Sequence, residues 1–223
     1  MRPINIYTLT RISKPSDLER LERQMSGRRN YLKIKSWEIE GLKSFCARLA
    51  DVMEEAEEVY FYYSFVMPKL GKEVDLLRVN DGSVVNVELK SGEVSDETIR
   101  KQLLQNRYYL ATLGKSMYSY TYVSGIGRLV RLSNSGRLVE ADWEELAQVL
   151  ERQTDCYDGH IEELFKEDRY LISPLTDPGR FLRREYFLTA QQKDIKKQIL
   201  WRIREITIGG TGADRKSTRL NSS

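Results

Sequence analysis

The chain has a single histidine and only two cysteines among its 223 residues. His160, Cys46 and Cys156 are too few to build a zinc site with four cysteine or histidine ligands. A single histidine also excludes nuclease and hydrolase sites that need paired histidines. A serine or cysteine triad would have to depend on His160. The chemistry of this protein is therefore expected to rest on carboxylates, on lysine and on a hard metal ion.

Long hydrophobic runs and a strong charge of one sign are also missing. The longest apolar run, from Val59 to Met67, is too short to cross a bilayer, and the N-terminal segment has no apolar signal region. The two cysteines are far apart, which argues against a disulfide framework and is typical of a reducing compartment. With 40% hydrophobic and 31% charged residues, the sequence predicts a globular, cytoplasmic protein with no membrane partner.

Charge is nevertheless clustered in two stretches. The formal net charge of +3 does not by itself indicate a nucleic-acid partner. One stretch, residues 20–35, is rich in arginine and lysine, and the other, residues 54–58, is rich in glutamate. Solvated surface is the simpler interpretation of both stretches.

The periodicity of apolar residues predicts one main α/β domain. Helices are expected at 16–25, 37–56, 95–113 and 142–153. Strands are expected at Tyr60–Met67, Glu73–Val79, Val84–Lys90, Tyr118–Val123 and Leu129–Leu132. Asn80-Asp81-Gly82 and Asn134-Ser135-Gly136 are turn sequences typical of hairpins. A mixed central sheet flanked by helices, with a helical C-terminal extension, is the architecture that buries these faces.

The same sequence patterns predict how the chain is divided into segments. Residues 1–36 are expected to form an N-terminal extension, 37–155 the main domain, 156–188 a linker, and 189–213 the start of a second domain. Residues 214–223, DRKSTRLNSS, resemble the translation of a sequencing adapter and are left out of the fold prediction. An ordinary disordered tail is the alternative interpretation of these ten residues.

The central strands carry the best candidates for catalysis. Asp75 lies in the first strand of the expected hairpin, and Glu88 and Lys90 lie two apart in the second, so that the last two point to the same face. Two carboxylates that converge among apolar neighbours repel each other unless a cation lies between them. Mg²⁺ is typically held by one or two carboxylates together with water and phosphate oxygens.

Asp75 and the triplet Glu88-Leu89-Lys90 resemble the motif of the PD-(D/E)XK nuclease superfamily, whose core is restriction-endonuclease-like. The resemblance covers roughly residues 37–124, although Val74 stands where the family often has proline. It implies that Asp75, Glu88 and the Leu89 carbonyl bind Mg²⁺ or Mn²⁺. It also implies that Lys90 positions the attacking water and offsets charge on the phosphate. Glu38, on the apolar face of its helix, matches an additional acidic residue found in many members, and Glu73 is a further candidate.

The helix that follows the triplet adds to this resemblance. Gln102, Gln105, Tyr108 and Tyr109 are similar to the glutamine–tyrosine helix motif of the RecB-like branch. The resemblance implies that a glutamine, assigned to Gln105, and a tyrosine steady the lysine. The alternative is an ordinary surface pair of Gln105 and Tyr109 at i,i+4 spacing.

A second resemblance lies near the C-terminus. Residues 188–192, LTAQQ, are similar to the Q motif of superfamily 1 helicases, in which Gln192 would contact adenine. A helix and a short strand at Ile206–Ile208 are expected to lead into a phosphate-binding loop that contains Gly209, Gly210 and Gly212. Arg215 stands where such a loop needs glycine, so we expect no ATP hydrolysis by this chain and ATP binding only in a longer parent protein. A glycine-rich loop that ends a domain is the alternative.

Together these features predict a metal-dependent nuclease that hydrolyses DNA or RNA, originally fused to a helicase-like ATPase. The competing interpretation is a non-catalytic nucleic-acid-binding domain that serves such a motor. The nuclease would require Asp75 and Mg²⁺ for its activity, whereas the nucleic-acid-binding domain would require neither.

Overall fold

The structure, a computed structural model, describes residues 1–29, 31–166, 169, 178–182 and 190–210. Its centre is a seven-stranded mixed sheet whose strands follow one another in chain order. The strands are β1 (Ile4–Asn5), β2 (Tyr60–Val66), β3 (Glu73–Val79), β4 (Ser83–Lys90), β5 (Ser116–Val123), β6 (Arg128–Leu132) and β7 (Leu138–Glu140). All neighbours are antiparallel except β4 and β5, which are parallel.

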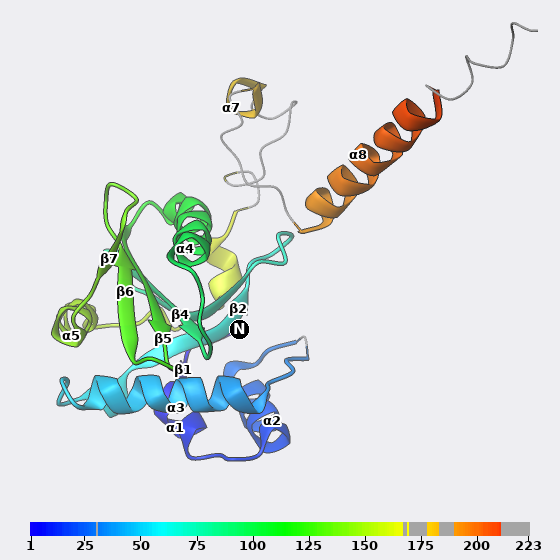
Figure 1. Cartoon of the computed structure of the whole chain (residues 1–223). Helices are drawn as coiled ribbons and strands as arrows, with labels where there is room; N and C mark the ends of the chain where they lie inside the picture. The colour runs from blue at the N-terminus through cyan, green and yellow to red at the C-terminus, as the bar shows by residue number, and fades with distance from the viewer. Residues whose placement is uncertain (30, 167–168, 170–177, 183–189, 211–223) are drawn as a thin grey trace, which may run out of the picture.

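Helices cover both faces of this sheet (Figure 1). One face carries α3 (Ser36–Ala50), with α1 (Ile6–Thr10) and α2 (Pro15–Ser26) beside it, and the other carries α4 (Asp96–Leu110). The remaining helices are α5 (Trp143–Glu151), α7 (Pro178–Leu182) and α8 (Ala190–Gly210). Short 3₁₀ turns occupy Ala56–Glu58, Ala111–Leu113 and Ile161–Leu164. Because β4 and β5 are parallel, a crossover must connect them, and α4 provides it.

Local signals explain where the central elements begin and turn. The Asn80 side chain accepts hydrogen bonds from the backbone N–H groups of Gly82 and Ser83, at 3.0 and 2.7 Å, which closes the β3–β4 hairpin. Ser95 caps α4 by accepting from the Thr98 N–H at 3.3 Å. β4 is buried on both faces, as expected for a strand between two helical layers.

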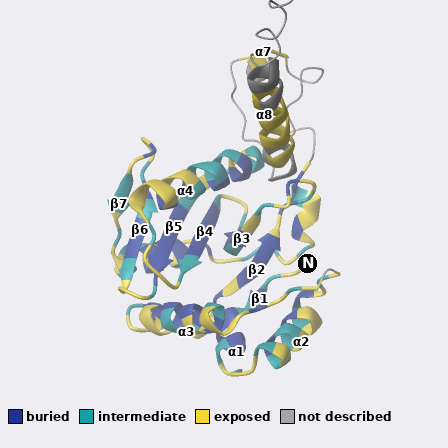
Figure 2. Ribbon diagram, turned by 45° about the vertical axis from the view of Figure 1, so that its right-hand side comes forward, coloured by how far each residue is buried: buried dark blue, intermediate teal, exposed yellow. Residues whose placement is uncertain are grey.

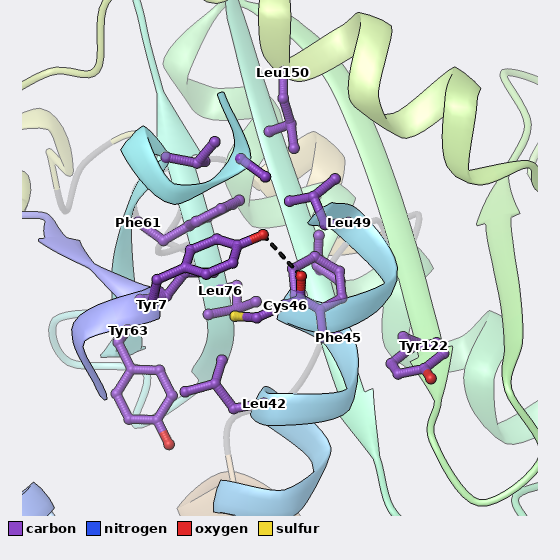
Figure 3. Close-up of a cluster of buried hydrophobic side chains, with 14 of the residues drawn as sticks. Tyr7, Leu42, Phe45, Cys46, Leu49, Phe61, Tyr63, Leu76, Tyr122 and Leu150 are labelled. Carbon is purple, nitrogen blue, oxygen red and sulfur yellow. Dashed lines mark hydrogen bonds between the residues drawn. The ribbon is translucent and has the colours of Figure 1, made fainter. Parts of the chain in front are cut away.

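The strands and the helices that cover them are largely buried (Figure 2), and the buried apolar side chains of the described residues form three clusters, one on the α3 side of the sheet and two that include residues of α4. On the α3 side, Phe45 and Leu49 pack against Val85 and Val87 of β4. Figure 3 shows this cluster, in which the Tyr7 hydroxyl donates to the Cys46 carbonyl at 2.8 Å. On the α4 side, the second cluster contains Tyr62, Leu77, Val84 and Leu110. The alternation of side chains along β3 and β4 therefore supplies both layers.

The N-terminal segment belongs to this core, although the sequence analysis treats it as an extension. Ile4 pairs with Phe61 in the sheet, and Ile6, Leu9 and Leu18 are buried in the α3-side cluster. The segment that follows 155 also contributes, because Ile161 and Phe165 pack in the α4-side cluster. Segments this short carry too few apolar repeats to reveal that they complete a core.

Two helix ends differ from the predictions. α3 ends at Ala50 rather than at residue 56. Asp51, Glu54 and Glu55, which follow, would lie unfavourably at the negative end of the helix dipole. α2 begins at Pro15, one residue before the predicted start, because proline is favourable at the first helical position.

The C-terminal helix corrects a further prediction. Residues Ile206–Ile208 belong to α8, which runs without a break to Gly210. A lone strand there would leave its backbone groups without partners, whereas a helix pairs them within the segment. No helix in the part of the chain that the structure describes has the length and apolar character needed to cross a membrane.

Candidate active site

The candidate site lies where β3 and β4 separate. Their paired register ends at Leu76 opposite Val87. One position further, the Asp75 side chain turns to β4, and its Oδ2 accepts a hydrogen bond of 2.8 Å from the Leu89 N–H. The Asp75 carboxylate thus accepts a hydrogen bond that a backbone carbonyl of β3 would accept in a regular ladder. The pairing of β3 with β4 ends beside it.

The structure brings together the three side chains that the sequence analysis singles out. Lys90 Nζ lies 3.8 Å from Asp75 Oδ2 and 3.6 Å from Glu88 Oε2. Glu88 is buried, with 1% of its side chain exposed, whereas the side chains of Asp75 and Lys90 are 28% and 23% exposed. One lysine ammonium therefore bridges two carboxylates, of which only that of Asp75 has substantial access to solvent.

Amide side chains hold the Glu88 carboxylate. Asn106 Nδ2 donates to Glu88 Oε1 at 2.6 Å, and Asn86 Nδ2 donates to the same oxygen at 3.3 Å. Gln102 Nε2 donates to Oε2. These contacts keep the buried carboxylate satisfied and fix its orientation. Sequence reasoning missed Asn86 and Asn106, although Gln102 and Asn106 have the i,i+4 spacing of one helix face and Asn86 precedes Glu88 by the strand repeat.

The assignment of the site's glutamine to Gln105 needs correction. Gln105 hydrogen-bonds to Tyr109, one turn further along α4, at the i,i+4 spacing of the alternative, but Tyr109 is buried in the α4-side cluster and this is not a surface pair. It is Gln102, one turn before Asn106, that reaches Glu88. The two glutamines are three residues apart, and the helix phase that decides between them depends on how α4 packs on the sheet.

The electrostatics of the site are dominated by its two acids. Burial and, next, the negative charge of Glu88 raise the pKa of Asp75 to about 7. The Lys90 ammonium and the hydrogen bond from Leu89 lower this pKa but do not cancel the increase. A further cation close to these two carboxylates would therefore be stabilised at neutral pH.

A cavity of about 940 Å³ opens over Asp75 and Lys90 and is also lined by Leu89. Glu38 and Glu73 line it too, but each is engaged elsewhere. Glu38 accepts from the Lys35 N–H at 2.8 Å and so caps α3, and Glu73 accepts from the Ser64 hydroxyl. Both lie at the cavity wall, outside the cluster around Lys90.

Tyr63 of β2 is a wall residue that the sequence analysis does not single out. It is 5% exposed and lines the cavity, and Figure 3 shows it at the edge of the core with its hydroxyl directed away from Cys46. Burial, followed by the nearby charges of Glu38 and Asp75, raises the pKa of Tyr63. The alternation of β2 places this ring, unlike that of Tyr62, on the cavity side.

Behind the cavity wall, a buried ion pair supports a kink in β2. Ser64 has a φ of 50°, which is uncommon for a residue other than glycine. The Arg28 guanidinium donates to the carbonyls of Tyr63 and Ser64, at 2.5 and 3.0 Å, and to the carboxylate of Glu22 at 3.2 Å. The α2 segment therefore fixes the backbone of the strand that forms the cavity wall.

The backbone that carries Lys90 is held by the turn after β5. Ser124 N–H donates to the Lys90 carbonyl at 2.8 Å, and a Cβ added at Gly125 would lie 2.8 Å from the Ser91 carbonyl oxygen. We expect Gly125→Ala to reduce the free energy of unfolding by about 1–3 kcal/mol, because backbone must move. Gly92→Ala is the control, since a Cβ there meets nothing within 4 Å. Equal denaturation midpoints for the two variants would contradict this prediction.

The residues assigned to a nucleotide site are not brought together in the described part of the chain. Gln192 lies in the first turn of α8 and Gly209 and Gly210 lie at its end, about 25 Å away along the helix axis. Gly212 lies outside the described residues. A phosphate-binding loop would have its glycines before a helix, whereas here they end one.

Among the described residues, no group of three or more histidine, cysteine, aspartate or glutamate side chains is placed to hold a metal ion. The candidate set consists of two carboxylates and the Leu89 backbone. Comparison of the chain with protein-family models, with curated proteins and with solved structures finds no match.

Proposed function

We propose that this protein is a Mg²⁺-dependent nuclease of the PD-(D/E)XK type, with a restriction-endonuclease-like core, that hydrolyses DNA phosphodiester bonds. The observation that carries the proposal is the convergence of Asp75, Glu88 and Lys90 at the open end of a β-hairpin, where Asp75 and Lys90 line a cavity. The spacing of the motif, its place in the strands and the helix that follows all support it.

The donor set fits a hard cation. Mg²⁺ is commonly held by one or two carboxylates, and burial followed by the charge of Glu88 raises the pKa of Asp75 despite the nearby Lys90 ammonium, so a further cation beside the two acids would be favourable. Asp75 and Glu88 would hold the ion, with the Leu89 carbonyl as the third protein ligand. Bound Mg²⁺ would supply Lewis-acid stabilisation of the charge that develops on the scissile phosphate.

The protein's own groups would perform the remaining work. The Lys90 ammonium, held between the carboxylates, offsets negative charge on the phosphate and orients a water for attack. The amides of Gln102 and Asn106 keep Glu88 from rotating, so the site is formed before substrate arrives. Asp75, the more exposed acid, faces the cavity through which the phosphate would enter.

Lys90→Met tests the proposal. Purified protein with Mg²⁺ or Mn²⁺ is expected to cleave labelled DNA, EDTA to stop cleavage, and Lys90→Met to lower the single-turnover rate by about 10²–10³-fold. Lys101→Met, which removes an exposed lysine from α4, is the matched control and should cleave like the unchanged protein. Cleavage by Lys90→Met at the normal rate, with the metal requirement intact, would exclude this site.

A second candidate function has one observation in its favour. Both oxygens of Glu88 already accept hydrogen bonds from amide groups, and its side chain is 1% exposed. A carboxylate held in this way also suits a purely structural role in a nucleic-acid-binding domain that serves a helicase-like motor. DNA binding that neither Mg²⁺ nor Asp75→Asn changes, without cleavage, would favour this function.

A further inference from the structure

The segment between α2 and α3 forms one wall of the cavity and carries an unusual combination of side chains. We call residues 27–35, of which Asn30 lies outside the described part, the basic loop. Arg29, Lys33 and Lys35 in this loop are exposed and line the cavity, as do two exposed aromatic rings, Tyr31 at 72% and Trp37 at 50%. Single exposed rings are common, whereas exposed apolar surface gathered in one place marks a candidate binding site.

The basic loop is anchored to the domain. The Glu19 carboxylate on α2 accepts from the Tyr31 hydroxyl at 2.5 Å and from the Ile34 N–H at 2.8 Å. These hydrogen bonds, that of Tyr31 first, lower the pKa of Glu19, so the anchor remains charged at neutral pH. Ile34 is buried in the α3-side cluster. The two rings are therefore presented from a fixed backbone, which reduces the entropy lost when a ligand binds.

Cation and ring are presented together at the start of α3. Lys35 Nζ lies 4.9 Å from the centroid of the Trp37 ring. This contact holds a positive charge beside an exposed aromatic surface. Arg28 does not take part, because its guanidinium is occupied by Glu22 and by the β2 carbonyls.

The cavity joins this wall to the candidate active site. Its lining includes Arg29, Tyr31 and Lys33 of the basic loop as well as Asp75 and Lys90 of the candidate active site. Arg29, Lys33 and Lys35 bring positive charge to this lining, and of the two acids that would hold Mg²⁺, Asp75 lines the cavity whereas Glu88 is buried behind it. A polyanion with flat bases matches the loop, and its backbone could continue to the carboxylates.

We propose that the basic loop and Trp37 bind single-stranded DNA, stacking its bases on Tyr31 and Trp37 and contacting its phosphates with Arg29, Lys33 and Lys35. This inference rests on the proposed nuclease function and specifies the substrate strand. Stacking on side chains needs bases with free faces, which a single strand offers and an intact duplex does not. At about 940 Å³, the cavity has the size of a pocket for a compact ligand, not for a double helix.

Equilibrium binding in EDTA tests this inference without cleavage. Fluorescence anisotropy of a labelled oligo(dT) is expected to show at least about tenfold tighter binding than a duplex of equal length, and Trp37→Ala to weaken binding of the single strand by about tenfold. Trp37→Phe should retain most of the affinity. Arg29→Glu with Lys33→Glu should weaken binding and reduce its dependence on salt, by about 0.7 in the log–log slope for each phosphate that the loop no longer neutralises.

Matched controls separate the loop from general effects of charge and aromatic surface. Trp201→Ala removes a tryptophan that is 60% exposed on α8, and Arg152→Glu reverses an exposed charge, and neither residue lines the cavity. Both variants should bind like the unchanged protein. Equal affinity for single strand and duplex, or Trp37→Ala binding at full strength, would overturn the inference.

The two proposals fail separately in this design. If the unchanged protein cleaves DNA under no condition but prefers single strands in a way that depends on Trp37, the nuclease is refuted. The loop then remains a DNA-binding surface. Cleavage that depends on Lys90 but is unaffected by Trp37→Ala, with no preference for single strands, retains the nuclease and rejects this substrate assignment.

Discussion

Asp75→Asn is expected to abolish metal-dependent cleavage, by at least about 10³-fold, while making the protein more stable at pH 8. The carboxylate that would hold Mg²⁺ is removed, although the side-chain oxygen of the introduced asparagine can still accept from the Leu89 N–H. A substitution that merely damaged the fold would lower activity and stability together. Opposite changes in the two quantities identify a group kept for function.

The sign of the stability change follows from the pKa of Asp75. This pKa is raised from 3.8 to about 7 in the folded protein, first by burial and then by Glu88. Between these values the folded state retains a proton that the unfolded state has lost, so Asp75 reduces the free energy of unfolding increasingly as pH rises from about 4 to 7. The asparagine variant lacks this titration. Its advantage is therefore greatest above pH 7 and shrinks toward pH 4.

Thermal unfolding measures this advantage. Because Asp75 is partly exposed and its attraction to Lys90 disappears in the variant, we expect a gain of about 1 kcal/mol at pH 8, or about 2–4 °C in Tm. Mg²⁺ should raise the Tm of the unchanged protein and leave that of Asp75→Asn unaltered, since only the former has the site. Asp81→Asn, at the exposed hairpin turn, is the matched control. A lower Tm for Asp75→Asn at pH 8, or an equal response to Mg²⁺, would contradict this assignment.

Glu22→Ala is expected to destabilise the protein by about 3–5 kcal/mol. Glu22 is fully buried and contacts the Arg28 guanidinium, whose side chain is 8% exposed. Removing the carboxylate leaves an uncompensated cation in the interior, and the same guanidinium holds the kinked backbone at Ser64. The loss should therefore also disturb the cavity wall.

Chemical denaturation of three variants separates these effects. Asp17→Ala breaks an exposed ion pair with Arg20 on the same helix and should change stability little. The double variant Glu22→Leu/Arg28→Met removes both buried charges and should recover much of the loss. A Glu22→Ala midpoint equal to that of Asp17→Ala would show that the buried pair does not support the fold.

The elements nearest the site were the easiest to predict. The bounds of β3 match the predicted strand, and α4, capped by Ser95, begins within one residue of the predicted start, because a hairpin turn and a capping residue act on backbone within a few positions. Such local signals did not predict that residues 1–36 contribute to the core. β1 has two residues, and its stability comes from pairing with β2, more than fifty positions away in the chain.

The candidate site was likewise predictable from the sequence only in part. The strand repeat alone places Glu88 and Lys90 on one face, and the composition alone directs attention to carboxylates and lysine. The choice of Gln102 over Gln105, and the recruitment of Asn86 and Asn106, depend on the rotation of α4 against the sheet. The interpretation of residues 20–35 as solvated surface also changes, because the fold places part of this stretch on the wall of the cavity.

The sequence by itself determined the chemistry available to this protein and most of its local structure, because one histidine, two cysteines, the turn residues and the apolar repeats act through composition or through near neighbours. Only the tertiary structure decided that Asp75 leaves the strand ladder to meet Leu89, that Lys90 bridges two acids, and that the basic loop shares one cavity with Asp75 and Lys90. Those relations join segments distant in the chain, and packing of helices on both faces of the sheet sets their distances.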